Sequence, residues 1–86
     1  MKKIVEIVLS ENENFKYGVG LDEMDYNILK GIAMKSKRSW YYPSTQDRKA
    51  LEYIKSFKES VGEDKYKVLL EHLGLTESLI ERVLER

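Results

Sequence analysis

The stretch YKVLLEHLGLTESLIERVLER, residues 66–86, decides the fold more than any other part of the chain. Leucine, isoleucine and valine recur every three or four residues on both sides of Gly74, which is the spacing of amphipathic helices. Glycine readily takes the left-handed conformation at a helix end, and Thr76 is a good N-cap for a following helix. We therefore expect one helix over 63–73 and another over 76–85, packed through their apolar sides.

Two earlier segments have the same helical pattern. Asp22 is expected to cap a helix over 22–36, because acidic side chains suit the positive end of a helix. Ser44 or Thr45 is expected to cap the next helix, over 45–60. The residues expected to face inward from these two helices are Leu21, Met24, Ile28, Leu29, Ile32, Ala33, Ala50, Ile54, Phe57 and Val61.

The N-terminal part of the chain has the pattern of strands. Residues 3–9 are rich in isoleucine and valine, and apolar residues alternate with lysine and glycine over 15–20. We predict an antiparallel hairpin over 3–20 with a loop of about five residues. The aromatic segment 39–42 precedes Pro43, which disfavours helix, so it is expected to be a short third strand or an ordered loop.

These elements predict an α+β fold. Residues 1–86 form a single domain in which the hairpin, with or without a third strand, packs on about four helices. A two-stranded hairpin is marginally stable by itself in water. It is therefore expected to pack against a helix, a third strand or a second subunit.

Composition excludes several kinds of chemistry. The chain has no cysteine and one histidine, His72, which lies off the apolar stripe of its helix. A disulfide framework or a thiolate zinc site is therefore ruled out, and we expect no metal, no cofactor and no catalytic constellation.

The apolar run near the N-terminus is interrupted by Glu6 and is too short to span a membrane. We expect a soluble, cytoplasmic, non-enzymatic protein.

The charges sum to zero but are sorted along the chain. Residues 6–25 hold six acids and one base, whereas residues 30–49 hold six bases and one acid. A neutral total gives no long-range attraction to nucleic acid, although a local basic face still can bind it. The sorting is equally compatible with pairing between two faces of the molecule or between two subunits.

The basic segment also carries the aromatic residues that indicate a contact surface. Tryptophan, tyrosine and arginine dominate protein–protein hot spots, and aromatic residues beside cations also hold single-stranded nucleic acid. A structural interpretation stays open, in which Trp40 and one tyrosine fill a gap between hairpin and helices. The residues expected to contact a partner are Lys35, Lys37, Arg38, Trp40, Tyr41, Tyr42 and Arg48.

The C-terminal helix pair resembles the generic helix-turn-helix motif. The apolar positions of that motif correspond to Leu69, Leu73, Leu75, Ile80 and Val83 around Gly74. The place that usually holds a small residue is Leu70, and residues 62–86 hold six acids and four bases. A duplex-reading face is normally basic, so an ordinary helical corner is the alternative interpretation.

We expect a small binding or regulatory protein that acts on another protein. The contact is expected at the basic-aromatic residues or at an exposed hairpin edge, which would add a strand or form a homodimer. The alternative is a small nucleic-acid-binding regulator that uses the helix pair or the basic segment.

Overall fold

The computed structural model describes residues 3–9, 18–38 and 40–85. In chain order these residues form strands β1 (Ile4–Val8) and β2 (Gly18–Asp22) and helices α1 (Glu23–Lys35), α2 (Thr45–Val61), α3 (Glu63–Leu73) and α4 (Glu77–Leu84). The predicted α+β fold, with an N-terminal antiparallel hairpin and four helices, is confirmed. The predicted hairpin loop and the first half of the second predicted strand lie outside the described residues.

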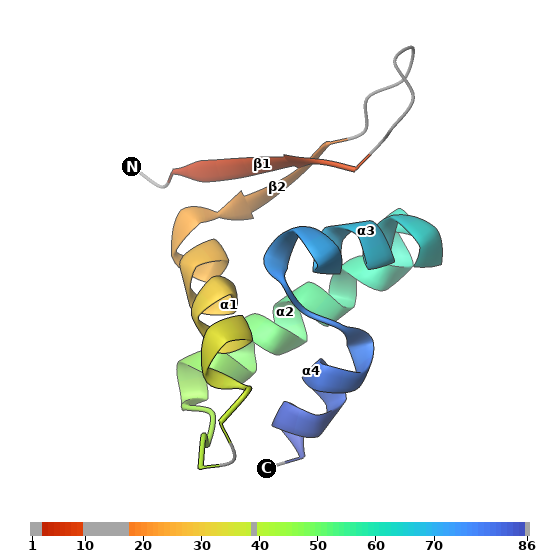
Figure 1. The fold of residues 1–86 in the computed structure, drawn as a ribbon. Coiled ribbons are helices and arrows are strands. Elements are labelled where there is room, and N and C mark those ends of the chain that lie inside the picture. The colour runs from red at the N-terminus through yellow and green to blue at the C-terminus, as the bar shows by residue number, and fades with distance from the viewer. Residues whose placement is uncertain (1–2, 10–17, 39, 86) are drawn as a thin grey trace.

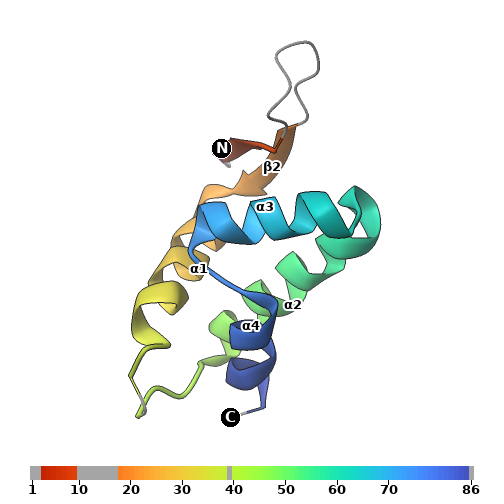
Figure 2. The same cartoon turned by 45° about the vertical axis from the view of Figure 1, so that its right-hand side comes forward.

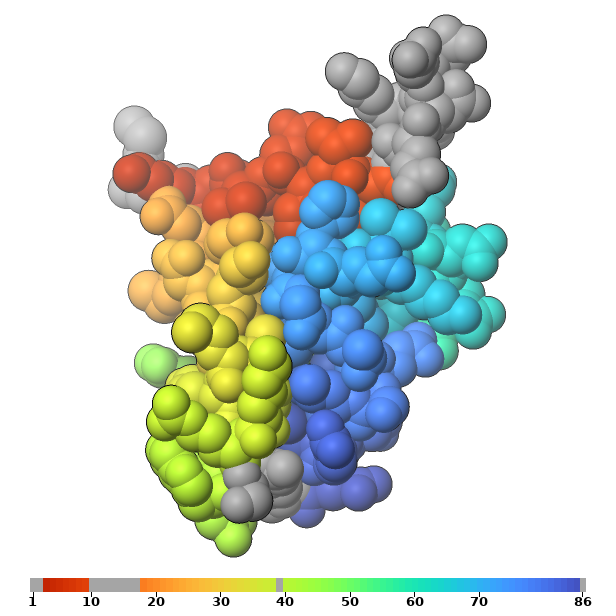
Figure 3. Space-filling model, viewed as in Figure 1, coloured from red at the N-terminus to blue at the C-terminus, as the bar shows by residue number. Residues whose placement is uncertain are grey.

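The hairpin covers one end of the helical part. Figures 1 and 2 show β1 and β2 lying across the beginning of α1 and across α3, while α4 and the C-terminus lie at the opposite end. The space-filling view shows β1 spread directly over α1 and α3 (Figure 3). The hairpin thus obtains from the helices the support that an isolated pair of strands lacks.

One face of the hairpin is apolar because alternate residues point inward. Val5 pairs with Leu21 and Ile7 with Val19, and Ile7, Val19 and Leu21 are buried. Leu21, expected on the stripe of the first helix, therefore belongs to β2. The helix begins two residues later, because the Asp22 carboxylate accepts a hydrogen bond from the Met24 N–H and caps it.

The other predicted caps are confirmed by their geometry. Ser44 and Asp47 form a capping box at the start of α2, and Thr76 accepts a hydrogen bond from the Leu79 N–H at the start of α4. Gly62 and Gly74 have φ angles of 90° and 78°. Residues other than glycine rarely adopt such positive φ angles, because their Cβ atom clashes with the backbone. The helix ends are therefore set by local chemistry.

The core is shared among all the elements. The inward stripe predicted for α3 is confirmed, since Leu69 and Leu70 of that helix are buried. Met24 was expected to face inward from α1, but 67% of it is exposed. Residues 40–42, the described part of the predicted third strand, lie in no strand. Among the residues that the structure describes, the buried apolar ones are Ile7, Leu9, Val19, Leu21, Leu29, Ile32, Tyr41, Ala50, Leu51, Ile54, Tyr66, Leu69, Leu70, Leu73, Leu75, Ile80 and Val83.

Candidate functional site

The segment between α1 and α2 is held by hydrogen bonds near both of its ends. The buried Ser36 hydroxyl donates to the Ala33 carbonyl at 3.2 Å, and the Arg38 N–H donates to the Lys35 carbonyl at 3.0 Å. The Tyr41 N–H then donates to the Arg38 carbonyl at 3.2 Å. The chain therefore leaves α1 through consecutive turns, and the aromatic residues that follow are presented on a constrained backbone.

Tyr41 anchors this segment to the core. Its ring is buried, and its hydroxyl donates a 2.5 Å hydrogen bond to Asp47 Oδ2 in the first turn of α2. The same carboxylate oxygen accepts the Ser44 N–H at 3.3 Å and lies 3.8 Å from the Lys35 ammonium, which is 5.4 Å from the centre of the Tyr41 ring. Asp47 thus links the end of α1, the connecting segment and the start of α2.

These contacts set the protonation of Asp47. Burial alone would raise the pKa of its carboxyl, but the hydrogen bonds from Tyr41 and Ser44 and the charge of Lys35 more than offset burial and lower the pKa from 3.8. The carboxylate is therefore ionised at neutral pH. Its electrostatic partners are internal, so it is a structural group rather than a proton donor.

The residues on either side of Tyr41 in the chain are exposed to solvent. Trp40 is 66% exposed, Tyr42 75% and Met34, near the end of α1, 76%. The Arg38 guanidinium lies 5.5 Å from the centre of the Trp40 ring, within the range of a cation–π contact. Beside them is a hollow of about 270 Å³ lined by Gly31, Met34, Lys35 and Arg38. We call Met34, Lys35, Lys37, Arg38, Trp40 and Tyr42 the basic-aromatic surface.

The structure divides the predicted contact residues into two groups. Lys35, Lys37, Arg38, Trp40 and Tyr42 remain exposed. Tyr41, expected at the contact surface, is a core residue. Arg48, expected there too, is half-buried, and its Nη1 donates to the Leu84 carbonyl at the end of α4 at 2.9 Å. The basic-aromatic surface lies at the end of the molecule away from the hairpin (Figures 1 and 3).

Met34 and the hollow beside it were not among the features predicted from the sequence. Met34 follows Ala33, the last residue of the predicted apolar stripe, and one step along a helix turns a side chain by about 100°. The position of Met34, a large apolar residue just outside the predicted buried stripe, was the feature of the sequence that indicated an exposed apolar side chain. Gly31 forms part of the floor, and the nearest atom to an added Cβ there would be Lys35 Cε at 3.9 Å.

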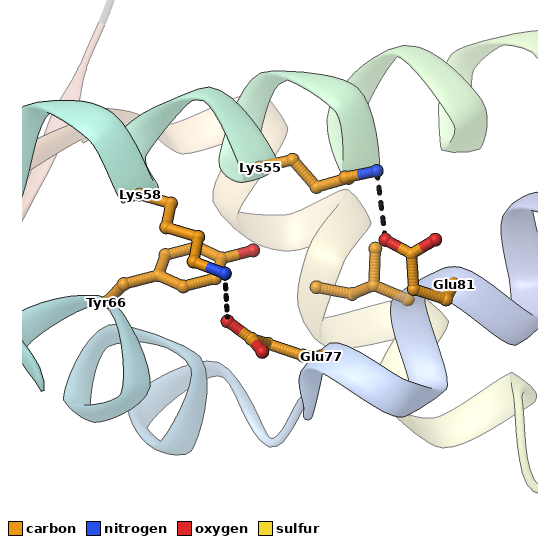
Figure 4. A pocket seen from close by; sticks show the side chains of 6 residues that line it. Lys55, Lys58, Tyr66, Glu77 and Glu81 are labelled. Atoms are coloured by element: carbon orange, nitrogen blue, oxygen red, sulfur yellow. Dashed lines mark ion pairs between the residues drawn. The ribbon is translucent and has the colours of Figure 1, made fainter. Parts of the chain in front are cut away.

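A second, smaller hollow of about 110 Å³ lies between α2 and α4. Figure 4 shows the ionisable groups of Lys55, Lys58, Glu77 and Glu81 converging on it, with Tyr66 alongside. Lys55 pairs with Glu81 at 3.0 Å and Lys58 with Glu77 at 3.2 Å. The charges are thus matched across the two helices, and they hold α4 against α2.

The chemistry of this hollow is that of a structural contact. Burial, with the charges of Glu77 and Glu81, raises the pKa of Tyr66 to about 12, so its phenol is neutral at physiological pH. A nucleophile or general base needs a pKa nearer the working pH. The pairing also affects the helix-turn-helix interpretation, since Glu77 and Glu81 of the presumed recognition helix face α2.

Other kinds of site have little support in the part of the chain that is described. Those residues contain no group of three or more histidine, aspartate or glutamate side chains placed to hold a metal. None of their helices is long and apolar enough to cross a membrane. His72 is exposed on α3, as expected from its position off the stripe. We found no significant match to the chain among protein-family models, curated proteins or solved structures.

Proposed function

We propose that this chain is a small non-enzymatic binding protein that acts on another protein through the basic-aromatic surface. The observation that carries the proposal is the exposure of Met34, Trp40 and Tyr42 beside cationic side chains, on a segment fixed by the burial of Tyr41. Large apolar side chains gathered at one exposed place usually mark an interaction site. Because the segment is already constrained, little conformational entropy is lost when a partner binds it.

The chemistry of this surface suggests the complementary features of its partner. The hollow beside Met34 has two cationic side chains, Lys35 and Arg38, on its rim. An apolar side chain would fill it, and a neighbouring carboxylate would reach the cations. We propose a partner segment that presents an acidic residue next to an aliphatic one. The cytoplasmic location expected from the composition remains part of the proposal.

Nucleic acid is the second candidate partner of this surface, and one specific observation supports it. The Arg38 guanidinium over the Trp40 ring, with Tyr42 exposed nearby, is an arrangement on which unpaired bases can stack. This version uses single strands rather than a duplex, because α4 directs Glu77 and Glu81 toward α2.

The test compares capture of a partner by matched variants. We expect Trp40→Ala and Tyr42→Ala each to abolish capture from a lysate of the native cell and to leave the free energy of unfolding within about 0.5 kcal/mol of wild type. The control is Met24→Ala, which removes an equally exposed residue (67%) at the other end of α1 and should retain capture. Equal capture by all three variants would refute the proposed surface.

Two further measurements separate the candidates. The chain has one tryptophan, so binding at this surface should change the emission of Trp40, and purified partner should reproduce that change without nucleic acid. For nucleic acid, titration with single strands and duplex across a salt series should show affinity that falls steeply with salt. Capture that is lost after nuclease treatment would favour the second candidate over the first.

A further inference from the structure

The side of α1 that faces solvent carries an apolar stripe. Met24, Asn27, Gly31 and Met34 are spaced three or four residues apart along the helix, so they share one face. The two methionines are 67% and 76% exposed, and Asn27 is exposed as well. Figures 1 and 2 show α1 at the margin of the molecule, with α3 and α4 on one side of it. We call Met24, Asn27, Gly31 and Met34 the outer face of α1.

The two ends of this outer face have opposite charges. Glu23 and Asp25 lie in the first turn of α1, on either side of Met24 in the chain. At the other end of the helix, Lys35 and Arg38 line the hollow of about 270 Å³ described above. Acids at the start of a helix and bases at its end stabilise the helix itself, but this does not account for an exposed methionine at each end. Each end thus combines an apolar side chain with charges that complement those of the other end.

The middle of the outer face is open to close approach by another helix. An added Cβ at Gly31 would meet Lys35 Cε at 3.9 Å, which is an ordinary contact distance, so packing within the described residues does not require a glycine there. Glycine inside a helix also lowers its stability. Contact with a second molecule gives this glycine a role, because a position without a side chain lets another helix come close. The hollow that Gly31 helps to line is then available to a side chain of that second helix.

We propose that two copies of this chain associate through the outer faces of their α1 helices, packed antiparallel. Met24 of each copy enters the hollow beside Met34 of the other copy. Glu23 of each copy then lies near Lys35 and Arg38 of the other. The arrangement has two-fold symmetry, so each of these contacts forms twice. The inference rests on the proposed function only in treating the hollow beside Met34 as a place of contact.

Spacing and charge both favour a second copy in this orientation. The outer face is symmetric about the middle of α1, since Met24 mirrors Met34 and Asn27 mirrors Gly31. An antiparallel copy therefore sets each acidic end against a basic end, whereas a parallel copy would set like charges together. The first turn of α1 also has the features proposed above for a partner, a carboxylate next to an apolar side chain. Because the 13 residues of α1 span only about 20 Å, the contact is small and the dimer is expected to be weak.

The first test is the mass of the full chain by light scattering, from about 10 µM to about 1 mM at low salt. We expect the mass to rise toward that of a dimer, and the rise to weaken with added salt, because opposite charges meet at both ends of the contact. Met24→Ala should weaken association by about tenfold or more, because it leaves the hollow unfilled. The control is Val8→Ala, which removes a 46% exposed apolar side chain from the far end of β1 and should associate like wild type.

Two charge-reversed variants test the antiparallel orientation. Glu23→Lys and Arg38→Glu each place like charges opposite one another at both ends of the contact, so each variant alone should stay monomeric. An equimolar mixture should form a mixed dimer, because the two changes are complementary across the antiparallel pair. Both variants must be folded for association to return, so recovery in the mixture also excludes unfolding as the cause of the loss.

Three results would overturn the inference. They are a monomer mass for wild type at about 1 mM, association of Met24→Ala equal to that of wild type, and a mixture of the two charge-reversed variants that stays monomeric. The inference and the proposed function fail separately. Met24→Ala should lose the dimer and keep capture of a partner, whereas Trp40→Ala should lose capture and keep the dimer.

Discussion

The hydroxyl of Tyr41 donates a 2.5 Å hydrogen bond to Asp47 Oδ2, and this contact decides which aromatic residue of the connecting segment faces inward. With Tyr41 committed to the core, Trp40 and Tyr42 are directed to the surface. The same hydrogen bond therefore stabilises the fold and presents the proposed contact residues.

Replacing Tyr41 by phenylalanine should lower the free energy of unfolding by about 1–2 kcal/mol. The substitution keeps the buried ring but leaves the Asp47 carboxylate without its shortest hydrogen bond. Urea unfolding at pH 7 measures the loss. The control is Tyr42→Phe, which removes the same hydroxyl from an exposed ring and should change stability by less than about 0.5 kcal/mol. Equal effects of the two variants would contradict the assigned role of the Tyr41 hydroxyl.

Asp47 should contribute to the acid sensitivity of the protein. Its pKa is lowered in the folded state, so its stabilisation is present above its unfolded pKa, near 3.8, and is lost as pH falls through the lower folded value. Asp47→Asn should therefore cost about 1–3 kcal/mol at pH 7. The difference in unfolding free energy between wild type and variant should shrink as the pH falls below about 4.

Urea unfolding over a pH series measures this difference, with Glu52→Gln, an exposed position on the same helix, as the control. A difference that does not change with pH would show that Asp47 does not titrate as described.

Tyr66 should contribute to loss of stability in alkali. Burial, with the charges of Glu77 and Glu81, raises its pKa to about 12, so the unfolded state ionises first as the pH rises. Its stabilisation is complete below the unfolded pKa of about 10 and is lost as the pH rises through about 12. Tyr66→Phe should therefore lose less stability than wild type across this interval. The control is Tyr42→Phe, and parallel curves for wild type and Tyr66→Phe would contradict the prediction.

Two glycine substitutions should change stability in opposite directions. Gly31 lies inside α1 with only Lys35 Cε, at 3.9 Å, near an added Cβ, so Gly31→Ala should stabilise the protein by about 0.5–1 kcal/mol. Gly74 has a φ of 78°, so Gly74→Ala should destabilise it by about 1–2 kcal/mol. Thermal unfolding measures both changes. A loss of stability in Gly31→Ala would indicate that something packs against the floor of the hollow beside Met34.

Local chemistry made much of the fold predictable. Capping at Asp22, Ser44 and Thr76 depends on residues within three positions, and the ends at Gly62 and Gly74 depend on the backbone freedom of one residue. The α3 stripe follows from helical spacing alone. These features lie within short windows of sequence, so a pattern is sufficient to find them.

The candidate sites were less predictable, because their residues meet only after folding. The aromatic run 40–42 indicated a contact surface, but the run itself does not say which of three adjacent rings is buried. That depends on Asp47, six residues beyond Tyr41. Arg48 was assigned to the contact surface because the sequence gives no sign of the Leu84 carbonyl, thirty-six residues away.

The sequence by itself determined the order, type and approximate ends of the elements, because these depend on near neighbours along the chain. Tertiary structure alone decided that Leu21 belongs to the hairpin and that Met24 and Met34 are exposed. Alternation along a strand or helix can be seen in sequence, but which side is buried depends on the elements that pack against it. Those packing partners are distant in sequence, so only the folded chain shows which side they cover.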